Sequence, residues 1–193
     1  MDVLLNNAGL IHKNPRNTFD QIKQMVETNF ISTSNLSEYT LNQNLISRGG
    51  IILSIGSFLA KLNVISDPEI KSQLINSKTK QDLLDLYQQS LALLSSNKPL
   101  FNKRELYPDY GFSKLLLQRY IHFLAQSKQV LDAGVQIYSC SVGWVKTDMG
   151  GDEAPLTVEE GVATPLYVLG LRDQVDMDIQ GKYFFENKVG KYM

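Results

Sequence analysis

The chain has 193 residues, of which 43% are hydrophobic and 20% charged, and its 19 basic and 20 acidic side chains nearly cancel. A protein that binds nucleic acid through phosphate contacts should carry a basic excess, so this class is excluded. A disordered chain would be poorer in apolar residues, so the sequence predicts a single globular domain over residues 1–193.

No apolar run approaches the roughly 18 residues of a membrane span, and the first residues lack the basic start of a signal peptide. The single cysteine, Cys140, cannot form an intramolecular disulfide and fits a reducing compartment. Its place in a predicted strand favours a core residue over a nucleophile. We therefore expect a cytoplasmic protein with no membrane partner.

Apolar runs that alternate with helical patterns define the predicted layers. Strands are predicted at residues 3–5, 51–55, 134–142 and 182–186. Apolar residues at three- and four-residue spacing predict helices at about 18–45, 109–127 and 157–169. Strands that alternate with helices indicate an α/β fold, here with four strands in a mainly parallel sheet and helices on both faces.

Residues 58–108 interrupt this alternation and predict a helical insertion. Asp67 before Pro68 predicts one helix start, and Thr79 with Asp82 predicts a second start of the capping-box type. We expect the helices, over 67–97, to lie outside the layers of the α/β fold.

Tyr110 and Lys114 are four residues apart on a predicted helix, so their side chains share one face. An ammonium group near a phenol stabilises the phenolate and lowers the pKa of the tyrosine, which suits general acid–base chemistry. Taken alone, the pair is explained equally well by a solvated helix face.

Motifs near the ends of three strands give the pair a context. Asn6-Asn7-Ala8-Gly9 ends the first strand, Ser57 follows the second, and Gly143 to Met149 follow the third. Ligands of open parallel sheets bind at these carboxyl ends. In this order, and along the whole chain, the motifs resemble those of the short-chain dehydrogenase/reductase family. The resemblance implies the C-terminal part of a Rossmann-like, doubly wound parallel sheet.

The resemblance also implies roles for individual residues. Tyr110 would be the general acid that protonates the carbonyl oxygen, and Lys114 would hold the nicotinamide ribose and lower the pKa of Tyr110. Ser57 would hydrogen-bond the substrate oxygen, and Asn29 would position a water in the proton relay, although a buried structural amide is the alternative for Asn29. The remaining cofactor contacts implied by the resemblance are Asn6, Gly9, Val145 and Thr147.

The spacing of Ser57 and Tyr110 indicates a subgroup of the family. The step from Ser57 to Tyr110 is 53 positions, whereas ordinary members separate the corresponding serine and tyrosine by about a dozen residues. An insertion of this length resembles NADPH-dependent carbonyl reductases, which are mostly monomers. The expected cofactor is NADP(H), and the expected partner is a small carbonyl or alcohol substrate. Val142 departs from the family, which has Pro before the Gly. His12 and His122 have no ligand-spaced neighbours, so no metal site is expected.

A dinucleotide-binding fold begins with a strand, a Gly-rich turn that holds the pyrophosphate, and a second strand. The sequence shows none of these before Val3, so the expected domain is incomplete by on the order of 80 residues. Residues 2–6 should then be an exposed apolar edge, and the 193 residues alone should not bind NADPH measurably.

Two hypotheses remain open at this point: a fragment of a carbonyl reductase, and a short non-catalytic remnant that acts as a binding protein. Another Rossmann-like enzyme, such as a methyltransferase, is remote because it leaves Ser57, Tyr110 and Lys114 unexplained.

Overall fold

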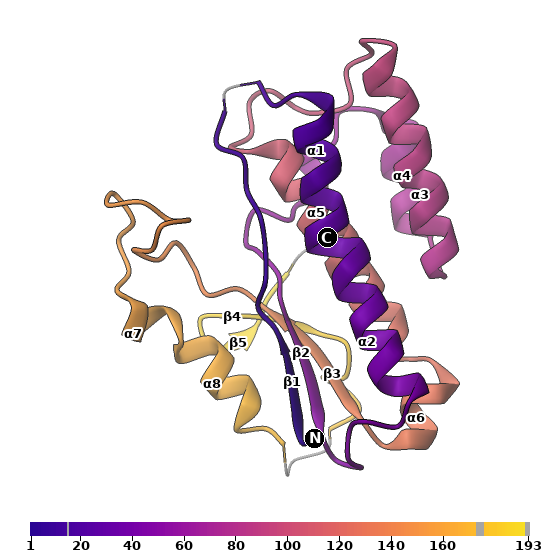
Figure 1. The fold of residues 1–193 in the computed structure, drawn as a ribbon, viewed down its shortest axis with the longest axis vertical. Coiled ribbons are helices and arrows are strands. Elements are labelled where there is room, and N and C mark those ends of the chain that lie inside the picture. Colours follow the sequence, from indigo (N-terminus) through magenta and orange to yellow (C-terminus); the bar gives the residue numbers. More distant parts are fainter. Residues whose placement is uncertain (15, 173–175, 192–193) are drawn as a thin grey trace.

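A computed structural model describes residues 1–14, 16–172 and 176–191. Its centre is one twisted sheet with strand order β1-β2-β3-β4-β5, in which the first four strands are parallel and the last is antiparallel (Figure 1). The strands are β1 (Val3–Asn6), β2 (Ile51–Ile55), β3 (Gln136–Cys140), β4 (Tyr183–Phe185) and β5 (Lys188–Val189). β2 and β3 pair in parallel, with Ile51 opposite Gln136.

The fifth strand corrects the expectation of four. It forms a hairpin with β4 through Glu186 and Asn187, whose φ angles are 53° and 58°. Two successive residues with positive φ make the turn that matches the twist of paired strands. β5 is only two residues long, so it leaves no alternating pattern in the sequence.

The first helical layer begins where the sequence predicts it. Thr18 caps α1 (Phe19–Val26) through a capping box with Gln21. The rod continues through a π-helical turn, Glu27–Ser32, into α2 (Thr33–Asn42), so it ends slightly before the expected Leu45. The π-helical turn was not predicted, and it carries Asn29.

Both helix starts of the insertion are confirmed. Asp67 accepts hydrogen bonds from the first turn of α3 (Pro68–Asn76), and Thr79 and Asp82 form the capping box of α4 (Lys80–Ser95). Figure 1 shows α3 and α4 beside α1 and α5, on the side of these helices that faces away from the sheet.

The other two predicted helices are each interrupted in the structure. α5 (Pro108–Leu124) ends early and is followed by a separate α6 (Lys128–Ala133). The single helix expected over 157–169 is split into α7 (Val158–Gly161) and α8 (Ala163–Leu169). Pro165 has no N–H to donate to the carbonyl of Gly161, so the α-helical pattern cannot run unbroken.

The core lies on both faces of the sheet. Ile52 and Ile137 face α1, α2 and α5, whereas Ile51 and Tyr138 face α8 on the opposite side. Cys140 is fully buried in the second cluster, as expected for a core residue. The strands therefore read as continuous apolar runs because both faces are covered.

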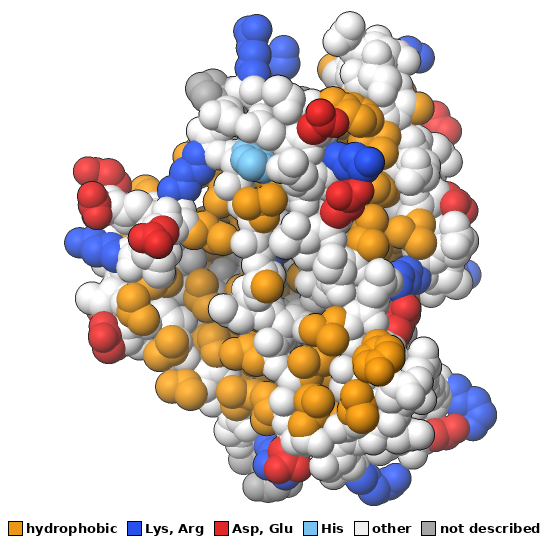
Figure 2. Space-filling view, in the orientation of Figure 1, with side chains coloured by type: hydrophobic (Ala, Val, Ile, Leu, Met, Phe, Trp, Pro, Cys, Tyr) orange, Lys and Arg blue, Asp and Glu red, His pale blue; other side chains and the backbone are white. Residues whose placement is uncertain are grey.

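One edge of the sheet is open. β1 pairs only with β2 among the described residues, and Val3 and Leu5 remain 37% and 43% exposed. Figure 2 shows hydrophobic side chains across the lower part of the molecule in this view, where Figure 1 places β1, α2 and α8. The exposed apolar edge predicted for residues 2–6 is confirmed. No helix within the described residues is long and apolar enough to cross a membrane.

Candidate active site

The carboxyl ends of β1, β2 and β3 open into one cleft of about 570 Å³. The loops that follow these strands and the first turns of α5 form its walls. Six of the residues singled out in the sequence line it. They are Gly9, Ser57, Tyr110, Lys114, Val145 and Thr147.

Ser57, Tyr110 and Lys114 converge because α5 starts beside the end of β2. The Ser57 hydroxyl lies near enough to the phenol of Tyr110 to favour the phenolate and lower the pKa of the phenol. The Lys114 Nζ lies 6.0 Å from the centroid of the Tyr110 ring and donates a 2.7 Å hydrogen bond to the Ile55 carbonyl. A Cβ at Gly111 would lie 2.6 Å from the Leu59 carbonyl oxygen, so glycine is needed for α5 to approach this closely.

The pKa of Tyr110 differs from the expectation. Burial raises it to about 12, because the phenolate loses solvation, and the Ser57 hydroxyl opposes this rise only in part. The expected lowering by Lys114 is absent, because its ammonium group lies over the ring, 6.0 Å from the centroid, and donates its hydrogen bond to the Ile55 carbonyl. The phenol is therefore held in its protonated form at neutral pH.

Lys114 is only 3% exposed, and burial lowers the pKa of its ammonium group to about 8. Its hydrogen bond to Ile55 uses one of three N–H donors. The other two can serve hydroxyl groups of a molecule in the cleft. Lys114 thus stays mostly protonated at pH 7 and keeps two N–H donors at the end of β2.

Asn29 is completely buried, and its side-chain amide forms hydrogen bonds with protein groups. Its Oδ1 accepts from the Leu10 N–H at 2.7 Å, and its Nδ2 donates to the Leu10 carbonyl at 2.8 Å and to the Ser113 hydroxyl at 2.9 Å. A Cβ at Gly9 would lie 3.4 Å from both Asn29 Oδ1 and Lys114 Nζ. Asn29 therefore fixes the loop after β1 beside Lys114, and its role in holding a water stays a prediction.

The structure does not bring Asn6 to the cleft. Its Nδ2 donates to the Ser37 hydroxyl at 3.0 Å and to the Ser54 hydroxyl at 3.1 Å, so the side chain joins β1 to α2 and β2. Asn7 lines the cleft instead. The alternation of side chains along an extended chain turns neighbouring amides to opposite sides.

Val145 and Thr147 lie in the loop after β3. Val145 pairs with Leu156 in an isolated bridge, and Thr147 accepts a 3.0 Å hydrogen bond from the Gly150 N–H. These contacts hold the loop as a wall of the cleft.

Sequence reasoning missed most of the apolar lining. These side chains come from the loop after β1, the insertion, and α7 with the residue that follows it, so no single motif marks them. They are Ile11, Phe58, Leu59, Leu106, Tyr107, Val158 and Val162, whereas Trp144 and Met149 lie in the motif from Gly143 to Met149.

Other reactive side chains lie outside this arrangement. Burial raises the pKa of the Cys140 thiol to about 12, which leaves it unreactive at neutral pH. His12 hydrogen-bonds Gln24 at 3.0 Å. No group of three His, Cys, Asp or Glu that could hold a metal ion occurs in the described part of the chain.

Mammalian relatives match this sequence over most of its length. Carbonyl reductase (NADPH) 1 of Bos taurus is 30% identical over 198 residues, which cover 98% of this chain and 69% of the relative. The chain belongs to the carbonyl reductases of the short-chain dehydrogenase/reductase family. Carbonyl reductase (NADPH) 3 of Rattus norvegicus is 32% identical over 177 residues, which cover 87% of this chain and 62% of that relative. No protein-family model matches the chain.

Solved structures agree with the family fold. Salutaridine reductase from Papaver somniferum has a TM-score of 0.80 at 17% identity, covering 96% of this chain and 72% of the other. The NADPH-bound carbonyl reductase from chicken fatty liver has a TM-score of 0.66 at 21% identity, covering 98% and 65%. At these identities the likeness establishes the Rossmann-like fold alone.

Proposed function

We propose that this chain carries the catalytic centre of an NADPH-dependent carbonyl reductase that acts on small apolar ketones or aldehydes. The convergence of Ser57, Tyr110 and Lys114 in one apolar cleft carries the proposal. Two neighbouring hydroxyl groups beside a cation can bind a carbonyl oxygen and supply the proton that its reduction requires.

The cleft fits the nicotinamide half of the cofactor. Gly9 keeps the floor free of a side chain next to Lys114, whose two remaining donors would hold the ribose hydroxyls. Thr147 and Val145, in the loop after β3, also line the cleft and would contact the carboxamide. When bound, NADPH supplies a hydride to the substrate carbon. No Gly-rich turn joins a strand to a helix in the described residues, so these residues offer no site of this type for the cofactor's pyrophosphate.

The protein residues would handle the carbonyl oxygen. Tyr110, protonated at neutral pH, would donate its proton as negative charge develops on that oxygen. Ser57 accepts a 3.1 Å hydrogen bond from the Leu59 N–H, so its own hydrogen is free for the phenol or the substrate oxygen. Lys114 would stabilise the phenolate that remains after proton transfer.

The apolar lining favours uncharged substrates. Trp144, Leu106 and Met149 line the cleft, as do Phe58 and Leu59, which follow Ser57 in sequence. Such walls would exclude water from the developing oxyanion and strengthen its hydrogen bonds.

The test replaces Tyr110 by Phe in the intact protein that contains this chain. Tyr110→Phe removes the proton donor and keeps the ring, so kcat for ketone reduction, followed as NADPH oxidation, should fall at least about 100-fold. Tyr39→Phe is the control, because Tyr39 lies on α2 and is 58% exposed. Near-full activity of Tyr110→Phe would overturn the assignment, and an intact protein without any NADPH-dependent reduction would favour the non-catalytic alternative.

A further inference from the structure

We infer that Gln118 is a positioning residue that holds Ser57 in place for the reaction. This inference rests on the proposed function, because it assigns Gln118 to the same catalytic centre. Gln118 does not line the cleft and would act through the backbone of Ser57.

The geometry is a clamp between α5 and the segment that follows β2. Tyr110, Lys114 and Gln118 occupy one face of α5 at four-residue intervals. Lys114 Nζ donates to the Ile55 carbonyl at 2.7 Å, and Gln118 Nε2 donates to the Ser57 carbonyl at 3.3 Å. Tyr110 meets the hydroxyl of the same Ser57. Three successive turns of α5 therefore contact Ile55, at the end of β2, and Ser57, two residues later.

Gly56 makes room for this clamp. A Cβ at position 56 would lie 2.7 Å from Gln118 Nε2 and 3.2 Å from its Cγ. Any larger residue would push the amide away from the Ser57 carbonyl. The glycine between Ile55 and Ser57 therefore belongs to the same arrangement as Gln118.

The clamp is not needed to satisfy backbone groups. The Ser57 carbonyl already accepts a 3.1 Å hydrogen bond from the Ala60 N–H. Gln118 is only 1% exposed, and its Oε1 is buried without a hydrogen-bond partner among the described residues. Burying an unpaired amide oxygen opposes folding, so an apolar side chain of similar shape would suit stability better. What Gln118 adds is a second, directional restraint on Ser57.

This restraint matters because Ser57 directs its hydroxyl at the reacting oxygen. The hydroxyl accepts from the Leu59 N–H, and its own hydrogen remains for the phenol or the substrate. A shift of the Ser57 backbone would move both hydrogen bonds. A misplacement of about 1 Å at such a site can cost on the order of 100-fold in rate.

The first test is Gln118→Met in the intact protein, with Gln136→Met as the matched control. Gln136 is also a buried glutamine, but it donates to the Gly49 carbonyl at the other end of the sheet. We expect Gln118→Met to lower kcat about tenfold, with an unchanged KM for NADPH and an unchanged or higher melting temperature. Gln136→Met should show the reverse, a lower melting temperature with unchanged kcat. A Gln118→Met variant with unchanged kcat would overturn the inference, and so would a loss of kcat that only parallels a loss of folded protein.

The second test asks whether Gln118 acts through Ser57. The double variant Ser57→Ala/Gln118→Met should be no slower than Ser57→Ala alone, whereas independent effects would multiply. A multiplied effect would overturn the inference.

A readout without turnover separates this inference from the proposed function. With tyrosine labelled with ¹³C at the ring carbon that bears the hydroxyl, the Tyr110 signal is identified by its loss in Tyr110→Phe. It should move in Ser57→Ala and in Gln118→Met but not in Gln136→Met. If the intact protein reduces no carbonyl compound, the proposed function fails, and this signal alone decides the inference. An unmoved signal in Gln118→Met would overturn it.

Discussion

Lys114 is the residue at which function and stability oppose each other. Burial lowers the pKa of its ammonium group from its ordinary value of 10.5 to about 8, so the folded state binds this proton more weakly than the unfolded state. The stability penalty is therefore complete below pH 8 and declines as the pH rises from about 8 toward 10.5.

We predict that Lys114→Met raises the free energy of unfolding at pH 7 by up to about 3 kcal/mol, the value that corresponds to this pKa difference. The gain should shrink at pH 9.5, because the native lysine is then largely neutral in the folded state. Urea unfolding at both pH values measures the difference. A gain that is equal at both would show that the charge of Lys114 is not its cause.

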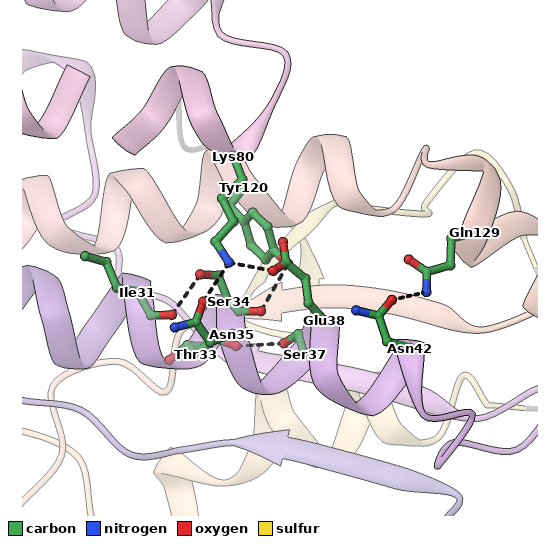
Figure 3. A network of polar contacts seen from close by, with 10 residues as sticks. All are labelled: Ile31, Thr33, Ser34, Asn35, Ser37, Glu38, Asn42, Lys80, Tyr120 and Gln129. Carbon is green, nitrogen blue, oxygen red and sulfur yellow. Dashed lines mark hydrogen bonds and ion pairs between the residues drawn. The ribbon is translucent and has the colours of Figure 1, made fainter. Parts of the chain in front are cut away.

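Between elements, a polar network fastens the insertion to the helical layer. Figure 3 shows Lys80 at the start of α4 reaching Glu38 on α2, with Tyr120 of α5 beside them. Lys80 Nζ lies 2.6 Å from Glu38 Oε2 and 2.7 Å from Asn35 Oδ1, and the Tyr120 hydroxyl is 3.3 Å from Glu38 Oε1. The Lys80 side chain is only 18% exposed, so its charge depends on Glu38.

We predict that Glu38→Gln lowers the free energy of unfolding by about 1–3 kcal/mol, because it leaves Lys80 half-buried without a counter-charge. The double variant Lys80→Met/Glu38→Gln should lose less than the single variants Lys80→Met and Glu38→Gln together, because it removes both charges. Urea unfolding of the four proteins gives the coupling. Strictly additive losses would mean that the ion pair does not hold α4 to α2.

Over the whole molecule, the sheet has one unprotected side. The outer edge of β1 is unpaired in the described residues, and Val3 and Leu5 expose apolar surface beside it. An unpaired edge with exposed apolar side chains is a template for strand addition.

For these 193 residues in isolation, we predict association that increases with concentration and is suppressed by Leu5→Lys, which places a charge at the edge. Ile75→Lys on α3 is the matched control, because Ile75 is similarly exposed, at 47%, but lies far from β1 in the fold. Sedimentation velocity measures the effect. Equal association of the two variants would place the contact elsewhere.

Most strands and helix starts depend mainly on local sequence, and the sequence predicts these correctly. Val3 to Leu5 and Ile51 to Ile55 are strands because continuous apolar runs suit burial on both faces, and Thr18 and Thr79 start helices because their side chains accept from the first turn. The positions of Ser57 and Tyr110 at strand and helix ends follow from the same local patterns.

Tertiary structure alone decided the chemistry of the site. The pKa of Tyr110 rises because burial outweighs its neighbours, which the four-residue spacing to Lys114 does not encode. Asn6 turns away from the cleft to meet Ser37, and Gln118 reaches Ser57 across 61 positions of sequence. Desolvation and long-range hydrogen bonds depend on which segments the fold packs together, so they have no signal in the spacing of residues along the chain.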